Sequence, residues 1–208
     1  LVDIGVNLTD KSFANDLDQV IGSAVDAGVR TLLITGTNLA ESEQALKLCD
    51  RFPEYTFCTA GVHPHHAKEW TPQHDEQLKA LAAENKVVAI GETGLDYNRN
   101  FSAPEQQRKA FESQLNLAAE LQMPLFLHER DAHEDQLSML KSFRPQLAGG
   151  VIHCFTGTQT ELEHYLELDL YIGITGWICD ERRGLHLQEL VKMIPQDRLL
   201  LETDCPYL

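Results

Sequence analysis

The chain has 208 residues, of which 43% are hydrophobic and 24% charged, as is usual for a globular protein. No apolar run is long enough to cross a bilayer and no export signal is visible, so we expect a cytoplasmic protein without a membrane partner. The formal net charge of −15 argues against a protein that coats nucleic acid through clustered lysines and arginines, but not against an enzyme that holds phosphates through metal ions. The length predicts a single domain over residues 1–208, and we expect a monomer.

Short apolar, β-branched runs alternate with segments of helical periodicity along the whole chain. Such runs without strict polar alternation are typical of strands buried on both faces, as in a parallel sheet. Eight strands are predicted, at Val2–Leu8, Thr31–Gly36, Thr56–Val62, Val87–Gly91, Pro124–His128, Gly150–His153, Leu170–Ile174 and Leu199–Glu202.

The helices between these strands have recognisable starts. A capping box pairs a capping side chain with Glu or Gln three residues later. This pattern predicts helix starts at Asn38–Glu41, Ser102–Glu105, Asp131–Glu134 and Thr158–Glu161. A solvated helix start is also expected at residues 181–183.

Eight strands alternating with seven helices predict a (β/α)₈ TIM barrel whose final helix is absent from this sequence. An open doubly wound sheet fits the alternation too. However, no Gly-x-Gly-x-x-Gly turn follows the first strand, which disfavours its dinucleotide-binding form. The sequence starts at Leu1 without a methionine and stops right after the eighth strand, so we expect the natural chain to continue by at least one helix.

Polar residues collect at the carboxyl ends of the predicted strands. In a parallel barrel these ends open on one face, so residues far apart in the sequence converge there. Two imidazoles and two carboxylates are expected to ring this mouth, from Glu92, His128, His153 and Asp204. One such residue is as often a turn residue as a ligand, but four at four strand ends favour a catalytic divalent-metal site.

Other residues near the same strand ends have two interpretations each. His63 directly follows the third strand and is a catalytic candidate, whereas His65–His66 are expected to be solvated. Arg130 fits a phosphate contact and a salt bridge equally well. Tyr97 and Trp177 fit base stacking, and they also fit ordinary packing.

Four segments carry a resemblance to a known family: Gly91–Asp96, Pro124–Glu134, His153–Gly157 and Ile194–Pro206. They resemble the TatD-type metal-dependent deoxyribonucleases, within the amidohydrolase-like barrels, over essentially the whole chain. The resemblance implies metal ligands at Glu92, His128 and His153, with Asp204 binding metal or activating water. It also implies Mg²⁺-dependent cleavage of DNA, with Mn²⁺ or Zn²⁺ as other candidate ions. The expected enzyme is a 3′→5′ exonuclease on single-stranded DNA or RNA ends, in DNA repair or degradation.

One departure from that family affects the metal site. The family usually carries Asp-x-His-x-His on its first strand, and here Gly5 and Asn7 stand where the histidines would be. The loss of two nitrogen ligands puts a second, tightly held transition metal in doubt and favours a hard ion such as Mg²⁺. A subgroup of the family shares the Gly/Asn pattern, so activity is expected to survive.

The hypothesis for the mechanism is that one divalent ion polarises the phosphate while Asp204 takes the proton of the attacking water. Arg130 and His63 are expected to steady the scissile phosphate or the leaving oxygen. Two alternatives stay open: a metal amidohydrolase or lactonase acting on small molecules, and a non-catalytic metal-binding scaffold. The missing strand-one histidines disfavour the first, and the retained Glu92 and Asp204 carboxylates disfavour the second.

Overall fold

A computed structural model describes residues 1–182 and 184–207. Its strands form one parallel sheet in which each strand pairs with the next along the chain. The strands are β1 Val2–Val6, β2 Thr31–Ile34, β3 Thr56–Ala60, β4 Val87–Asp96, β5 Leu125–Arg130, β6 Gly150–Ile152, β7 Tyr171–Ile174 and β8 Leu199–Leu201. All eight predicted strands are therefore present, but β4 continues past its predicted end at Gly91 to Asp96.

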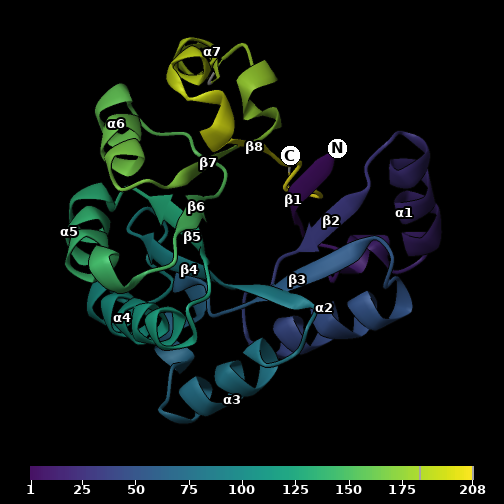
Figure 1. Ribbon diagram of the computed structural model, residues 1–208, viewed down its shortest axis with the longest axis horizontal. Helices are drawn as coiled ribbons and strands as arrows, with labels where there is room; N and C mark the ends of the chain where they lie inside the picture. The colour runs from purple at the N-terminus through teal and green to yellow at the C-terminus, as the bar shows by residue number, and fades with distance from the viewer. Residues whose placement is uncertain (183, 208) are drawn as a thin grey trace.

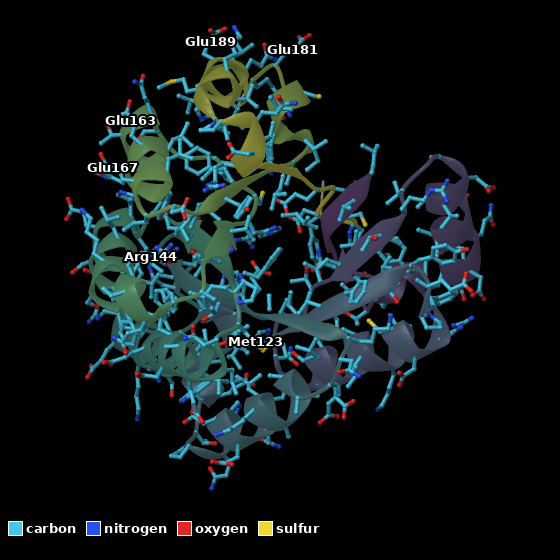
Figure 2. The ribbon with its side chains drawn as sticks, in the orientation of Figure 1. Met123, Arg144, Glu163, Glu167, Glu181 and Glu189 are labelled. Carbon is cyan, nitrogen blue, oxygen red and sulfur yellow. The ribbon has the colours of Figure 1, made fainter. Side chains whose placement is uncertain are left out.

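Helices cover the outside of this ring of strands (Figure 1). They are α1 Leu17–Asp26, α2 Leu39–Arg51, α3 Gln73–Ala82, α4 Pro104–Leu121, α5 His133–Phe143, α6 Gln159–Glu167 and α7 Leu185–Leu190. Acidic side chains such as Glu163 and Glu167 on α6 point away from the barrel (Figure 2). Among the described residues, no helix is both long and apolar enough to cross a membrane. The helix start expected at 181–183 includes Arg183, which lies outside the described residues.

The ring closes between β1 and the segment that follows β8. The Asn7 backbone nitrogen donates to the Cys205 carbonyl (2.9 Å), and the Asp204 backbone nitrogen donates to the Gly5 carbonyl (2.8 Å). The buried Asp3 carboxylate accepts from both the backbone nitrogen (2.9 Å) and the hydroxyl (2.7 Å) of Thr203. These contacts join the first and last strands, and the predicted (β/α)₈ barrel is confirmed.

Two hydrophobic clusters fill the space on either side of the strands. The larger one lies between strands and helices and includes Phe111, Leu115 and Ile152. The smaller one takes one residue from each of six strands and occupies the barrel interior, with Ile4, Leu33, Ala89, Phe126, Val151 and Leu200. The Phe126 ring packs against the His153 ring, tilted by 32° with 4.8 Å between ring centroids, so this inner cluster is the floor of the barrel mouth.

Two of the four helix starts occur as predicted. Thr158 and Glu161 form the expected capping box, whereas Asn38 accepts from the Glu41 nitrogen but the Glu41 carboxylate accepts from the Thr37 hydroxyl, so that box is only half formed. The other two helices start one residue later than predicted. Ser102 does not cap α4, because its hydroxyl accepts from the Lys68 nitrogen (2.9 Å) and donates to the His65 carbonyl (3.0 Å). Asp131 adopts a left-handed conformation (φ 52°), and α5 follows Ala132. In both places tertiary contacts and backbone geometry replace local capping.

Buried glutamines on the helices hold the backbone at the carboxyl ends of β3 and β4. The Gln114 amide accepts from the Val62 nitrogen (2.8 Å) and donates to the Val62 carbonyl (3.0 Å). Gln107 makes the same pair of bonds with Asp96, both at 2.8 Å. These contacts fix the backbone just before His63 and at Asp96, so the outer helices position the mouth.

Replacement of Gln114 by Met is expected to lower the free energy of unfolding by about 1–3 kcal/mol, because it leaves two buried backbone groups of Val62 without partners. Urea denaturation measures this change. Gln77→Met on the exposed face of α3 is the matched control and is expected to have no measurable effect. Equal midpoints for the Gln114 variant and the unmodified protein would contradict this role for the amide.

Candidate active site

The four predicted metal ligands converge at the carboxyl ends of β4, β5, β6 and β8. Glu92 lies within β4, and its Oε1 is 3.0 Å from Nδ1 of His128 and 3.9 Å from Nε2 of His153. That same His153 nitrogen is 3.7 Å from Oδ1 of Asp204. Glu92 and His153 are each 6% exposed, so the cluster sits in the mouth and not on the outer surface.

His63 is a fifth member of the cluster, with its Nε2 3.4 Å from the same Glu92 oxygen. Its Nδ1 accepts a hydrogen bond from the His65 backbone nitrogen (3.1 Å). Burial lowers the pKa of His63 to about 4, so the ring is neutral near pH 7. A neutral ring that accepts at Nδ1 carries its proton on Nε2, so His63 presents a donor to the site, not a metal-binding lone pair.

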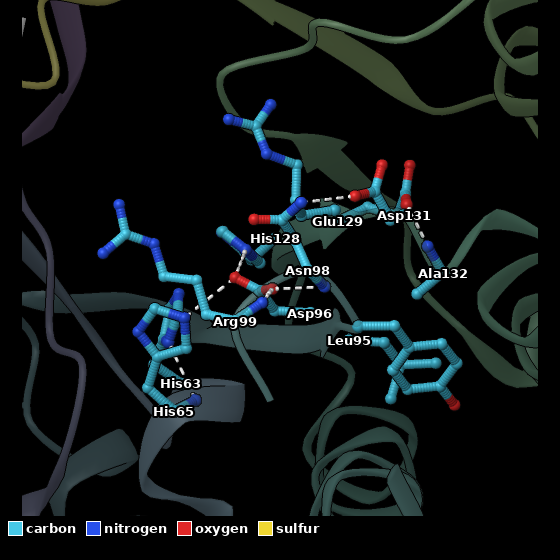
Figure 3. Close-up of polar contacts among 12 residues, drawn as sticks. His63, His65, Leu95, Asp96, Asn98, Arg99, His128, Glu129, Asp131 and Ala132 are labelled. Atoms are coloured by element: carbon cyan, nitrogen blue, oxygen red, sulfur yellow. Dashed lines mark hydrogen bonds and ion pairs between the residues drawn. The ribbon is translucent and has the colours of Figure 1, made fainter. Parts of the chain in front are cut away.

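Asp96 is a site residue to which the sequence analysis gave no role. Its Oδ2 is 2.8 Å from Nε2 of His65 and 3.3 Å from Nε2 of His128 (Figure 3). Glu92 and Asp96 therefore hold His128 from opposite ring nitrogens. Burial alone would lower the pKa of His128, but the hydrogen bonds to Asp96 and Glu92 raise it to about 9. Alternation along β4 places Glu92 and Asp96 on one face, which is the signal that could have identified Asp96.

Glu202, at the end of β8, was also missed as a site residue. Its carboxylate is 2.5 Å from Nδ1 of His153 and accepts from the Cys154 backbone nitrogen. Burial opposes protonation of His153, but the Glu202 carboxylate outweighs it and raises the pKa of His153 to about 10. With Nδ1 held by Glu202, Nε2 of His153 faces Glu92 and Asp204, as second-sphere carboxylates arrange metal-binding histidines.

The glycine at position 5 is required by this arrangement. A Cβ atom on Gly5 would lie 2.5 Å from the Glu202 carboxylate, and one on Gly173 would collide with its other oxygen. Glu202 therefore occupies the space that a side chain at position 5 would need. The departure from the Asp-x-His-x-His pattern is thus matched by a buried carboxylate from the opposite end of the chain.

Asn7 acts as a hydrogen-bond donor in the structure. Its amide donates to Oδ1 of Asp204 (2.9 Å) and to the Cys205 carbonyl (3.2 Å). Burial raises the pKa of Asp204 to about 6, while His153 partly opposes this shift. A carboxylate that titrates near neutral pH and is oriented by Asn7 is suited to proton transfer.

The weaker candidates lie around this cluster. Arg130 is exposed, and one guanidinium nitrogen donates to the Thr156 hydroxyl (3.1 Å). The hydroxyl of Tyr97 donates to Asp135 (2.7 Å), and the Trp177 ring packs against the main hydrophobic cluster. The solvated position expected for His65 is wrong, because Asp96 binds it.

The donor set fits a divalent cation. Within each of two groups, the possible ligand atoms lie within 4.8 Å of one another. The first is His63, Glu92 and His128, in which His63 contributes a hydrogen-bond donor and the other two residues the ligand atoms. The second is His153, Cys154 and Asp204. Glu92 links the two groups through its contact with His153. Carboxylate oxygens and imidazole nitrogens that face one another in a buried mouth are the usual ligands of a catalytic divalent ion.

Comparisons with known proteins agree with the barrel fold and identify the family of the chain. The family model described as TatD related DNase matches residues 2–208. A protein of Erwinia billingiae named 3′-5′ ssDNA/RNA exonuclease TatD is 61% identical over all of this chain and 80% of its own length. A Salmonella typhimurium protein of the same name is 54% identical over the same shares.

Solved structures give the same result. A TatD homologue from Escherichia coli superposes with a TM-score of 0.91 at 28% identity, covering 99% of this chain and 79% of that one. A TatD family hydrolase from Entamoeba histolytica gives 0.89 at 33% identity, covering 99% and 74%. The chain belongs to the TatD-related deoxyribonuclease family.

Proposed function

We propose that this protein is a metal-dependent nuclease that hydrolyses phosphodiester bonds at the 3′ ends of single-stranded DNA or RNA. The observation that carries the proposal is the convergence of two imidazoles and two carboxylates in the mouth of a barrel of this family. The names of relatives at 54% and 61% identity support the nucleic-acid substrate over a small-molecule amide or lactone.

We assign the metal to Glu92, His128, His153 and Asp204. A divalent ion supplies positive charge for the phosphate oxygens and lowers the pKa of water at the site. Mg²⁺ is the proposed ion, because Gly5 and Asn7 contribute no imidazole nitrogen and Mg²⁺ prefers oxygen ligands.

The protein's own groups supply proton transfer and orientation. Asp204, with its pKa raised to about 6, accepts the proton of the attacking water. His63 presents Nε2–H toward the site and is placed to donate to the leaving or non-bridging oxygen. Arg130, the last residue of β5, and Arg99, on the loop after β4, are exposed cations. There they counter the acidic surface and bind phosphates further along the nucleic-acid strand.

Removal of the proposed ligands is expected to abolish nuclease activity. His128→Ala and His153→Ala should each lower mononucleotide release from a 3′-labelled single strand in Mg²⁺ by about 100-fold or more, since loss of even a ligand's partner costs roughly 10–100-fold. His66→Ala, at a half-exposed histidine outside the cluster, is the control and should leave the rate unchanged. Release that persists in either variant or in chelator would contradict the assignment.

The stability of the metal-free protein should fall as pH rises above about 6.5. The pKa values of His128 and His153 are about 9 and about 10 in the folded protein, above the value near 6.5 of an unfolded histidine. The folded state therefore binds these protons more tightly. Their contribution to stability is complete below about pH 6.5 and is lost as pH rises through about 9–10.

Urea denaturation in chelator between about pH 6 and pH 10 measures this loss. His66→Gln, outside the cluster, should retain the same pH dependence. A free energy of unfolding that is constant or rises over this range would contradict the charged state of the two histidines.

The arginines are expected to act through phosphate charge. Arg99→Ala or Arg130→Ala should raise KM for a single-stranded oligonucleotide and reduce the slope of log KM against log salt by about 0.7 per lost contact. Arg30→Ala, just before the amino end of β2 and so at the opposite end of the barrel, is the control. Slopes equal to that of the unmodified protein would exclude phosphate contacts at both positions.

A further inference from the structure

The loop between β4 and α4 carries an exposed aromatic ring beside the proposed metal site. Phe101 is 54% exposed, and its ring lies 4.7 Å from the ring of His65 at an interplanar angle of 75°. His65 in turn contacts the Asp96 oxygen that also holds His128. Three successive contacts, through His65 and Asp96, therefore link the Phe101 ring to the proposed metal ligand His128.

The loop holds this ring in place. Ser102, which is 2% exposed, binds the backbone of Lys68 and His65, and its own carbonyl accepts from the buried amide of Gln107 (2.9 Å). On the amino-terminal side of Phe101, the side-chain amide of Asn100 donates to the Tyr97 carbonyl (2.6 Å). An exposed ring between two anchored neighbours is ordered before a ligand arrives, which reduces the entropy lost on binding.

The same loop provides a cation. Arg99 is exposed, its backbone nitrogen is fixed by Oδ1 of Asp96 (3.0 Å), and Figure 3 shows its side chain extending on the side of His63 and His65. No carboxylate pairs with its guanidinium in the described part of the chain. A ring and a cation two residues apart, next to a hydrolytic site, match the combination by which proteins bind single-stranded nucleic acid.

We propose that Phe101 is a platform on which one nucleobase of the substrate strand stacks, with Arg99 holding a neighbouring phosphate. This subsite rests on the proposed nuclease function and deepens it, because it gives a reason for a single-strand preference. A base inside a duplex has both faces covered by its neighbours, so only an unpaired base can offer a face to the ring. Every base has such a face, so this contact tolerates any sequence and serves DNA and RNA alike.

The platform is tested with oligonucleotides that carry one abasic residue, placed in turn at each of the last few 3′ positions. For the unmodified protein, the loss of the base at the stacked position should lower kcat/KM about 5- to 100-fold, as stacking energies predict. In Phe101→Ala and Phe101→Leu this penalty should disappear, because neither side chain has a flat face. Phe101→Trp should retain it.

Tyr171→Ala is the matched control, since it removes an exposed aromatic ring at the amino end of β7, and it should retain the full penalty. A penalty of the same size in Phe101→Ala as in the unmodified protein would overturn the platform. Unmodified protein that cleaves abasic and normal strands equally at every position would also overturn it, while the nuclease function would stand. If the unmodified protein cleaves no normal strand, the nuclease function fails and the subsite fails with it.

Discussion

A row of alternating carboxylates and imidazoles crosses the barrel mouth, and the rest of the site depends on it. Its members, in order, are Asp96, His128, Glu92, His153 and Glu202, with successive separations of 3.3, 3.0, 3.9 and 2.5 Å. A buried carboxylate is costly unless it is paired, and here each one has an imidazole partner. This row links β4, β5, β6 and β8, so the carboxylates and imidazoles can pair only when these strands are in register. The same pairing fixes which ring nitrogens face the proposed metal position.

Two positions at the first strand, Gly5 and Asn7, accommodate this pairing of carboxylates and imidazoles. Gly5 leaves the space that the Glu202 carboxylate occupies, and a larger side chain there would displace the group that holds His153. Asn7 turns its amide toward Asp204 and so orients the proposed base. Compared with the family's Asp-x-His-x-His motif, the first strand lacks two histidine ligands. In the fold, both positions support groups that other strands contribute.

The sequence predicted the strands and four of the central residues because both depend on local signals. Apolar runs mark buried strands, and Glu92, His128, His153 and Asp204 each end or closely follow such a run. The site role of Glu202 could not be predicted from the sequence, because it depends on contacts with His153 and Gly5, which lie 49 and 197 positions earlier. The helix starts near Ser102 and Asp131 were misplaced by one residue for a similar reason. Ser102 binds the segment that follows the neighbouring strand β3, and no local pattern encodes that contact.

Glu92, His128, His153 and Asp204 are proposed to hold one divalent ion at the barrel mouth. Crystals soaked in Mn²⁺ and measured at its absorption edge test this directly, because the anomalous signal locates the ion without assumptions about catalysis. We expect a peak bounded by these four side chains, with Nδ1 of His153 still bound to Glu202. A peak elsewhere, such as between His65 and Asp96, or no peak at saturating Mn²⁺, would contradict it.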